Sequence, residues 1–177
     1  MVVVYYQWMK LLAEIIEEGV SLDEFEKMGG SYSLRKSARV ILLNNAGEMA
    51  VQHLVNESYH KLPGGGVDSG ETTKEALLRE VQEEVGCACE IQDEIGVIIE
   101  YRITEPLLHI SYCYLAQVIG EVGEPALEPE EVKQGQVTLW LKPEEVLRLM
   151  KLDNPEPGIG QMILKREIAF IEEYLIN

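Results

Sequence analysis

The sequence has few cysteines and no long apolar run, and each scarcity excludes a class of protein. The three cysteines, Cys87, Cys89 and Cys113, are odd in number and lack the paired spacing of a zinc site. We expect buried, reduced thiols, which favour a reducing compartment over a disulfide-stabilised secreted fold. The N-terminal segment MVVVYYQWMKLL lacks a basic region, a cleavage site and the length needed to span a bilayer. These features predict a cytoplasmic protein.

Basic residues are also scarce, with 15 lysines and arginines against 31 aspartates and glutamates and a formal net charge of −16. A nucleic-acid backbone and an anionic membrane both require a basic protein surface, so we expect neither as the main partner. A small phosphorylated ligand stays open, because a divalent cation can join its phosphates to protein carboxylates. The acidic balance can equally serve solubility alone.

The first thirty residues are predicted to be helical. Apolar residues recur at helical spacing from Trp8 to Ile16, which predicts an amphipathic helix before Gly19. Ser21 and Glu24 resemble a capping box, which predicts a short second helix. We therefore expect a helical extension at residues 1–30, attached to one domain at residues 31–177 that is large enough for its own core.

The remainder of the chain alternates strand-like and helical segments. Strands are predicted at residues 38–45, 49–56, 88–103, 107–119 and 136–141. One helix is expected to open at Pro143, and an amphipathic C-terminal helix is expected from the apolar stripe Leu164, Ile168, Ile171 and Leu175. Many strands with few helices between them favour an α+β fold with a mixed sheet.

The segment LPGGGVDSGETTKEALLREVQEEVGC, residues 62–87, joins a glycine loop to a glutamate-rich helix. Thr72 and Glu75 form a capping-box pair, so we expect the helix to begin at about Thr73. Gly86 is placed to end it. The apolar residues recur at spacings of four and must face the sheet: Leu77, Val81 and Val85.

The same helix gathers three glutamates, Glu80, Glu83 and Glu84, on one flank. Like charges at this spacing destabilise a helix, and the last turn favours cations instead. A solvated acidic face is the plain interpretation. The preceding glycines favour a site instead, because the backbone N–H groups of Gly64, Gly65 and Gly66 can approach a phosphate closely. Oxygen ligands suit Mg²⁺, which commonly bridges carboxylates to substrate phosphates.

These residues resemble the Nudix box: a glycine, five residues, a glutamate, seven residues, then Arg-Glu-aliphatic-any-Glu-Glu-any-Gly and an apolar residue. The matching positions are Gly65, Glu71, Arg79, Glu80, Val81, Glu83, Glu84, Gly86 and Cys87. The one departure is Cys87, where the family usually has an aliphatic residue, and cysteine can fill that role as a small hydrophobe. The order of the neighbouring strands extends the resemblance to about residues 35–150.

The resemblance implies an α/β/α sandwich and a hydrolase of nucleoside diphosphates linked to another moiety. It implies that Glu80, Glu83 and Glu84 bind Mg²⁺ or Mn²⁺, that Arg79 braces the glycine loop, and that Glu71 supports the geometry of this loop. The chemistry agrees, because cations neutralise a diphosphate and lower the pKa of bound water. Glu80 is one candidate general base. Glu131 and Glu130, ranked ahead of Glu128, are others in an acidic loop.

Several residues outside the box have two interpretations. Arg35 and Lys36 lie just before the first predicted strand of the domain, and Arg39 lies at its start. Each of the three either contacts phosphate or is a surface charge. The three histidines form no ligand cluster by spacing, and a structural role is favoured for His109. Tyr101, Tyr112 and Tyr114 either stack on a base or pack at the margin of the core.

Three functions stay open at this point. A nucleoside-triphosphate or oxidised-nucleotide pyrophosphatase of MutT-like type is slightly favoured over an ADP-ribose or nucleotide-sugar pyrophosphatase. The latter tends to have a proline about sixteen residues beyond the box, whereas Pro106 lies later. A non-catalytic Nudix domain that binds a nucleotide metabolite is the third option, although such domains commonly lose box glutamates. A homodimer is one option for the oligomeric state.

Overall fold

The structure, a computed structural model, describes residues 9–177 of the chain. This part contains the strands β1 (Leu11–Ile16), β2 (Ser33–Leu43), β3 (Met49–Leu54), β4 (Tyr59–Lys61), β5 (Ala88–Arg102), β6 (Leu107–Ile119) and β7 (Gln136–Leu141). Its helices are α1 (Leu22–Lys27), α2 (Thr73–Glu84), α3 (Pro129–Gln134), α4 (Pro143–Met150) and α5 (Ile159–Ile176). The strands and helices predicted beyond residue 31 are all among these elements.

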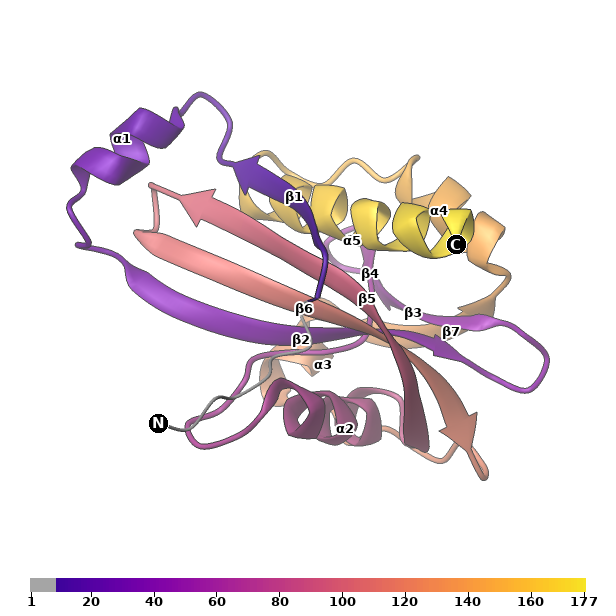
Figure 1. The fold of residues 1–177 in the computed structure, drawn as a ribbon. Coiled ribbons are helices and arrows are strands. Elements are labelled where there is room, and N and C mark those ends of the chain that lie inside the picture. Colours follow the sequence, from indigo (N-terminus) through magenta and orange to yellow (C-terminus); the bar gives the residue numbers. More distant parts are fainter. Residues whose placement is uncertain (1–8) are drawn as a thin grey trace, which may run out of the picture.

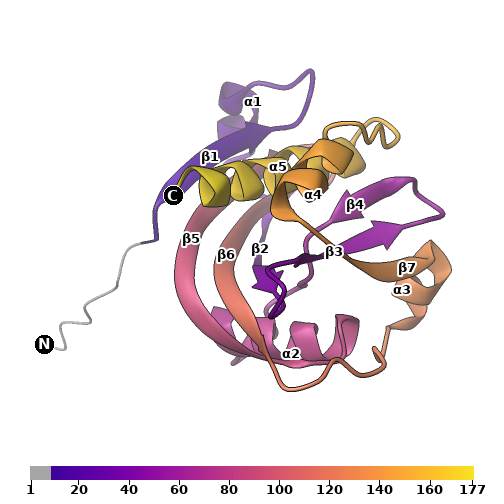
Figure 2. The ribbon, with the colours of Figure 1, turned by 90° about the vertical axis from the view of Figure 1, so that its right-hand side faces the viewer.

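One mixed sheet of seven strands organises the molecule. Its order is β1–β5–β6–β2–β3–β4, and β7 pairs with β3. The β1/β5 and β2/β6 pairs are parallel, while the other neighbours are antiparallel. The β2/β3 register consists of the single pair Leu43–Met49, so β3, β4 and β7 diverge from the long strands (Figure 2).

Alternating side chains of β2 supply two cores on opposite faces of the sheet. Val40 and Leu42 pack with Leu77 and other residues of α2 in one buried cluster. Ile41, between them, belongs to a second cluster that includes residues of α4 and α5. Figure 1 shows α2 on one side of the sheet and α4 and α5 on the other. The predicted α/β/α sandwich is therefore confirmed.

The predicted N-terminal helix is wrong where the structure describes it, because Leu11–Ile16 is strand β1. Trp8, the first residue of the predicted stripe, lies outside the described residues. The segment pairs in parallel with β5, from Leu11 opposite Val97 to Ile16 opposite Tyr101. A stripe of leucines and isoleucines suits either structure over so short a length, and the open edge of β5 decides between them. The second helix, α1, is confirmed with its Ser21–Glu24 capping box.

Three further differences bear on the site. Strand β2 begins at Ser33, so Arg35 and Lys36 lie within it, together with Arg39, and not before it. The acidic segment treated as a loop contains helix α3, which Pro129 opens and Gly135, with a φ of 67°, closes. The short strand β4 was not predicted.

Within residues 9–177, no helix is long and apolar enough to cross a membrane.

Gly96 permits the close docking of β1 on β5. A Cβ atom at this position would lie 2.6 Å from Leu12 Cγ and 2.8 Å from the carbonyl oxygen of Lys10. That same carbonyl accepts a hydrogen bond of 2.8 Å from the backbone N–H of Val97. A side chain at Gly96 would therefore push β1 away from the sheet.

We expect Gly96→Ala to lower the free energy of unfolding by about 1–3 kcal/mol, as overpacking does. The amides of β1 and of Val97 should then exchange with solvent faster in hydrogen-exchange measurements. Glu90→Ala, at an exposed position of the same strand, is the control and should leave both unchanged. Unaltered exchange at Val97 in Gly96→Ala would contradict the docking role of this glycine.

Candidate active site

Helix α2 begins and ends where the sequence predicts. The Thr72 backbone N–H donates to Glu75 Oε2 at 2.8 Å, and the Glu75 N–H donates back to Thr72 Oγ1 at 3.2 Å. Gly86 follows the last turn with a φ of 76°, and a Cβ there would lie 2.8 Å from backbone atoms of Gly123 and Glu124. Leu77 and Val81 are fully buried against the sheet. The register of the glutamates is therefore fixed by both caps and by the apolar face.

Arg79 connects the helix to the glycine loop. Its Nη2 donates to the carbonyl oxygen of Gly66 at 2.9 Å. Its Nε and Nη2 donate to the two carboxylate oxygens of Glu71, at 3.0 and 3.1 Å. The forked guanidinium thus binds a carboxylate through two parallel hydrogen bonds, a geometry that lysine cannot reproduce. The contacts that loop bracing by Arg79 and Glu71 requires are present.

The same guanidinium brings Glu80 and Glu83 together. Arg79 Nη1 lies 2.8 Å from Glu80 Oε1 and 3.0 Å from Glu83 Oε2. Glu71 first, and then Glu80 and Glu83, raise the pKa of Arg79. Burial raises the pKa of Glu80, although Arg79 opposes this shift. Two of the three predicted carboxylates therefore converge on one cationic group. Arg79 therefore makes both an i,i+4 ion pair with Glu83 on its own helix and the contact with the glycine loop.

Gly65 makes room for the carboxylate of Glu80. A Cβ atom at Gly65 would lie 2.3 Å from Glu80 Oε1 and 2.7 Å from Glu80 Oε2. The carbonyl oxygen of Gly65 also accepts the N–H of Ala38 at 3.0 Å, which attaches the loop to β2. Absence of a side chain at Gly65 is therefore a requirement for placing Glu80 beside the loop.

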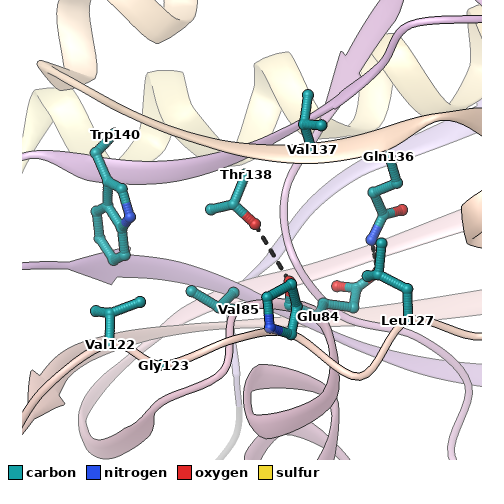
Figure 3. Close-up of a pocket in the computed structure, with 10 residues that line it drawn as sticks. Glu84, Val85, Val122, Gly123, Leu127, Gln136, Val137, Thr138 and Trp140 are labelled. Atoms are coloured by element: carbon teal, nitrogen blue, oxygen red, sulfur yellow. Dashed lines mark hydrogen bonds between the residues drawn. The ribbon is translucent and has the colours of Figure 1, made fainter.

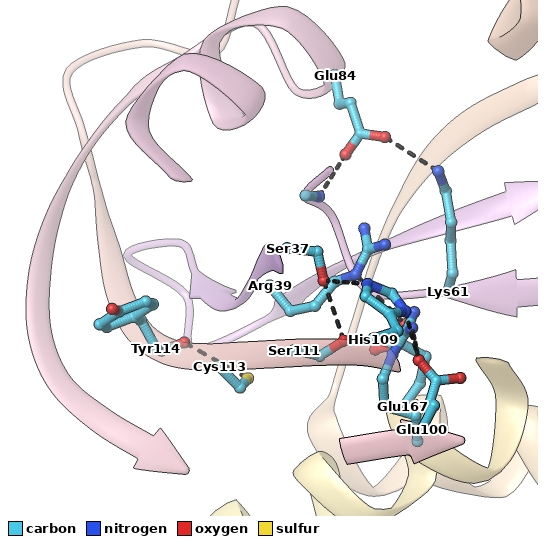
Figure 4. A network of polar contacts seen from close by, with 12 residues as sticks. Ser37, Arg39, Lys61, Glu84, Glu100, His109, Ser111, Cys113, Tyr114 and Glu167 are labelled. Atoms are coloured by element: carbon cyan, nitrogen blue, oxygen red, sulfur yellow. Dashed lines mark hydrogen bonds and ion pairs between the residues drawn. The ribbon is translucent and has the colours of Figure 1, made fainter. Parts of the chain in front are cut away.

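Glu84 is directed to different partners. Its Oε2 accepts the backbone N–H of Gly64 at 2.6 Å, while its Oε1 lies 3.1 Å from Lys61 Nζ and 3.0 Å from Gln136 Nε2. The residue is 1% exposed. Burial alone would raise the pKa of Glu84, but Lys61, the Gly64 N–H and Arg39 together lower it. Figure 4 shows the carboxylate turned toward Lys61. The amide of Gly64, predicted to contact substrate, is thus engaged by Glu84.

The carboxylates fit a divalent cation in part. Within residues 9–177, no group of three or more His, Cys, Asp or Glu side chains is arranged as a metal site. Glu80 and Glu83 offer the oxygen ligands that Mg²⁺ and Mn²⁺ prefer, and both already converge on a positive charge. A cation could take the place of Arg79 Nη1 there, while Arg79 keeps its bonds to Glu71 and Gly66. Glu84 does not share this arrangement.

Helix α3 brings one of its two predicted glutamates to the site. Burial first, and then the neighbouring Glu84 carboxylate, raise the pKa of Glu131 to about 7. Its Oε2 also accepts the Glu128 N–H at 2.8 Å. Glu130 instead points outward, with its side chain 66% exposed and 3.2 Å from Lys133 Nζ. Among the residues outside the box, Glu131 is therefore the placed candidate for a general base.

Arg39 is buried, so its interpretation as a surface charge is wrong. It is 8% exposed, and its Nε lies 3.7 Å from Glu167 Oε1. Its Nε and Nη1 have no hydrogen-bond partner among the described residues. Burial first, and then Arg166, lower the pKa of Arg39, whereas Glu167, Glu84 and Glu80 raise it. Arg35 and Lys36 are exposed.

Behind Arg39 lies a buried polar network that spans β5, β6 and α5 (Figure 4). Arg166 Nη1 contacts Glu100 at 2.8 Å, and Arg166 Nη2 contacts Glu167 at 2.6 Å. His109 Nδ1 lies 2.6 Å from Glu100, and its Nε2 lies 3.0 Å from the hydroxyl oxygen of Ser37. Burial lowers the pKa of His109 to about 4. These contacts agree with a structural role for His109.

Among the described residues, two of the tyrosines considered for base stacking have hydrogen-bonded side-chain partners. The hydroxyl of Tyr101 donates to Glu14 at 2.6 Å, and its ring packs edge-on against Phe25. The hydroxyl of Tyr114 lies 2.6 Å from Thr73 Oγ1. Tyr112 packs against the core beneath α2. The described contacts favour the structural interpretation of all three.

A cavity of about 310 Å³ lies beside the end of α2, between β7 and residues 122–127 (Figure 3). Its wall is mostly apolar and includes Val85, Val122, Leu127 and Trp140. Glu84 borders it, but Glu80 and Glu83 do not. The Thr138 hydroxyl donates to the carbonyl oxygen of Glu84 at 3.2 Å, which ties the helix end to β7. The cavity therefore adjoins the carboxylate site without containing its Arg79 cluster.

The sequence alone did not identify two polar partners of the site, Lys61 and Gln136. Lys61 immediately precedes Leu-Pro-Gly, and the only available signal was a lysine next to a glycine loop. Gln136 opens the strand QVTLWL and carries no motif. The pairing of β4 and β7 with β3 brings both to Glu84.

Comparisons with known proteins agree with this geometry. A family model described as the NUDIX domain matches residues 33–161. An RNA pyrophosphohydrolase of Erythrobacter litoralis is 28% identical over 135 residues, which cover 66% of this chain and 80% of that protein. Another, of a Marinomonas species, is 34% identical over 77 residues, 42% of this chain and 48% of that protein.

Solved structures share the fold at low sequence identity. A NUDIX hydrolase from Nitrosomonas europaea superposes with a TM-score of 0.61 at 15% identity, covering 81% of this chain and 90% of that one. A MutT protein from Methanosarcina mazei gives 0.55 at 22% identity, covering 81% and 96%. An ADP-ribose pyrophosphatase from Streptococcus suis gives 0.52 at 17% identity, covering 81% and 92%. At these identities the likeness establishes the fold alone.

The two neighbouring glycines provide a matched test of the Glu80 cradle. We expect Gly65→Ala to displace the Glu80 carboxylate and to weaken Mn²⁺ binding about tenfold or more, as changes in supporting groups do. Gly66→Ala is the control, because its Cβ would approach nothing closer than Arg35 Nη2 at 3.5 Å. Calorimetric Mn²⁺ titration of both variants is the measurement. Equal affinities would show that the contact does not position Glu80.

Proposed function

The chain belongs to the Nudix family of hydrolases that cleave pyrophosphate bonds, and we propose that it acts on small nucleotides with the help of Mg²⁺ or Mn²⁺. The observation that carries this proposal is the convergence of Glu80 and Glu83 on Arg79 Nη1, with Arg79 also bound to the glycine loop. A cation held by Glu80 and Glu83 would neutralise diphosphate charge and lower the pKa of a bound water.

The residues of the chain have separate tasks in this proposal. Glu80 and Glu83 hold the cation, and Gly65 and Gly66 present backbone beside it. Arg79 fixes the loop to α2 through Gly66 and Glu71. Glu131 serves as the general base, since its raised pKa, about 7, suits proton transfer near neutral pH. In this proposal Arg39, whose Nε and Nη1 have no hydrogen-bond partner among residues 9–177, supplies positive charge near the diphosphate.

We propose a nucleoside triphosphate or an oxidised form of one as substrate, ahead of ADP-ribose or a nucleotide sugar. ADP-ribose pyrophosphatases tend to have a proline about sixteen residues beyond the box. The nearest proline here, Pro106, lies later, between β5 and β6, which disfavours this substrate class. The sequence relatives are named RNA pyrophosphohydrolases, which favours RNA as a second candidate substrate. The net charge of −16 opposes a long RNA backbone, because RNA-binding surfaces are basic. The three buried free thiols support the proposal that the protein works in a reducing compartment such as the cytoplasm.

A hydrolysis screen tests both the reaction and the substrate. Chelator-treated protein should be inactive and should regain turnover with Mg²⁺ or Mn²⁺, and nucleoside triphosphates should be cleaved faster than ADP-ribose, nucleotide sugars or 5′-triphosphorylated RNA. Glu83→Gln should reduce kcat about 100-fold or more, because it removes one charged ligand. Glu90→Gln, an exposed acid on β5, is the matched control. Full turnover by Glu83→Gln would reject the cation site.

The two glutamates of α3 allow the general base to be tested against its neighbour. Glu131→Gln should reduce kcat at saturating substrate and cation by about 100-fold, the usual scale of general-base catalysis. Glu130→Gln changes the same helix by the same chemistry at an exposed position and should retain turnover. If both variants remain fully active, Glu80 becomes the leading candidate for the base.

A further inference from the structure

We propose that Glu167, a fully buried residue of α5, is a positioning residue of the active site. It holds the guanidinium of Arg39 beside the glycine loop, where Arg39 binds an oxygen of the substrate's diphosphate. The inference rests on the proposed function and extends it, since it names the residue that fixes the charge of Arg39. Arg39 lies on β2 and Glu167 on α5, so neither belongs to the box.

Backbone contacts place Arg39 against the glycine loop. The residue before it, Ala38, donates its backbone N–H to the carbonyl oxygen of Gly65 at 3.0 Å. Gly64 lies closer still, because a Cβ atom there would be 3.0 Å from Arg39 Cα and 2.1 Å from the carbonyl oxygen of Ala38. The loop that is proposed to face phosphate therefore packs directly on the strand at Arg39.

The charged groups around Arg39 lie on two sides of it. Arg166 and Glu167 belong to α5, whereas Glu84 and Glu80 belong to α2, and all four influence the charge of Arg39. Figure 4 shows Arg39 between Glu84 and Glu167. Arg39 is therefore the member of the buried network that stands next to the proposed cation site.

Hydrogen bonding distinguishes Arg39 from a purely structural arginine. Arg166, in the same network, donates to Glu100 at 2.8 Å and to Glu167 at 2.6 and 3.2 Å. Arg39 has a side chain that is only 9% exposed, yet its Nε and Nη1 have no hydrogen-bond partner among the described residues. Buried donors without partners are costly, and a guanidinium forms strong paired hydrogen bonds with phosphate oxygens. Arg39 thus keeps donors for a diphosphate that the fold itself does not use.

Glu167 holds Arg39 without occupying these donors. Its Oε1 lies 3.7 Å from Arg39 Nε, which is too far for a hydrogen bond, and the same oxygen accepts Arg166 Nη2 at 2.6 Å. Attraction between opposite charges in a buried setting acts over this distance. Phe170 and Ile171, both fully buried, fix this part of α5. Without Glu167, Arg39 would face Arg166 unopposed and move, so KM should rise more than kcat falls.

Binding of methylenebisphosphonate, a diphosphate analogue that cannot be hydrolysed, measures this role in the full chain with Mg²⁺ by calorimetry. Arg39→Met should weaken binding about tenfold or more, because it removes charge-assisted hydrogen bonds. Glu167→Gln should weaken binding less, and should add no further loss in the Arg39→Met background. Lys36→Met on β2 and Glu172→Gln on α5 make the same charge changes at accessible positions, and should stay within about twofold of the parent.

Mn²⁺ binding, followed by the EPR signal of the free ion, separates positioning from general damage to the site. Arg39→Met should bind Mn²⁺ at least as tightly as the parent, because it removes a positive charge near Glu80 and Glu84. A parallel loss of Mn²⁺ and analogue binding would overturn the proposal. Unchanged analogue affinity in Arg39→Met, or an independent loss from Glu167→Gln in that background, would also overturn it.

An NMR measurement on the parent protein covers the case in which Glu167→Gln does not fold. The Nε–H signal of Arg39, identified by its loss in Arg39→Met, should shift when the analogue is added with Mg²⁺. A signal that does not move would overturn the proposal. If the analogue binds through Arg39 but no nucleotide is hydrolysed, the proposed reaction fails while the role of Glu167 stands.

Discussion

The arrangement of the site depends on one guanidinium. Arg79 binds Glu71 and the carbonyl oxygen of Gly66 on the loop side, and it binds Glu80 and Glu83 on the helix side. Its planar fork can satisfy all four partners at once because its five donors point in fixed directions. The loop, the supporting glutamate and the two carboxylates therefore hold a common geometry. Without this cation, the carboxylates would repel one another at the edge of the helix.

The mutual repulsion of the glutamates of α2 is offset by two different sets of positively charged or hydrogen-bond-donating partners. Glu80 and Glu83 share the half-buried Arg79, whose contact with them can be exchanged for another cation. Glu84, one residue further, turns inward to Lys61 and the Gly64 amide. A helix places residues 80, 83 and 84 on one flank, yet the side chains diverge because their nearest positive charges lie on opposite sides. The helical spacing alone therefore does not determine which partner each carboxylate contacts.

Local patterns in the sequence predicted most of the fold and part of the site. The Thr72 cap, Gly86 and the stripe of Leu77 and Val81 act within one helix, so both ends of α2 could be predicted from the sequence. Strand β1 could not, because the edge of β5 and the missing side chain of Gly96 determine its conformation. Lys61 and Gln136 could not be predicted as partners of Glu84 for the same reason. They meet Glu84 only through the pairing of β3 with β4 and β7, and sequence spacing does not record that pairing.

The chain is acidic as a whole, but basic side chains predominate in the interior behind the glycine loop. On the α5 side of β2, three buried arginines, Arg39, Arg102 and Arg166, face two buried glutamates, Glu100 and Glu167. With His109 neutral, this network carries an excess of positive charge. Arg39 is close enough to Glu84 and Glu80 to interact with both charges. Buried ionised groups persist only with compensation, so this interior charge helps Glu84 to remain ionised. A strongly acidic protein can therefore hold ionised carboxylates beside the proposed diphosphate site, because positively charged side chains lie in the sheet beneath them.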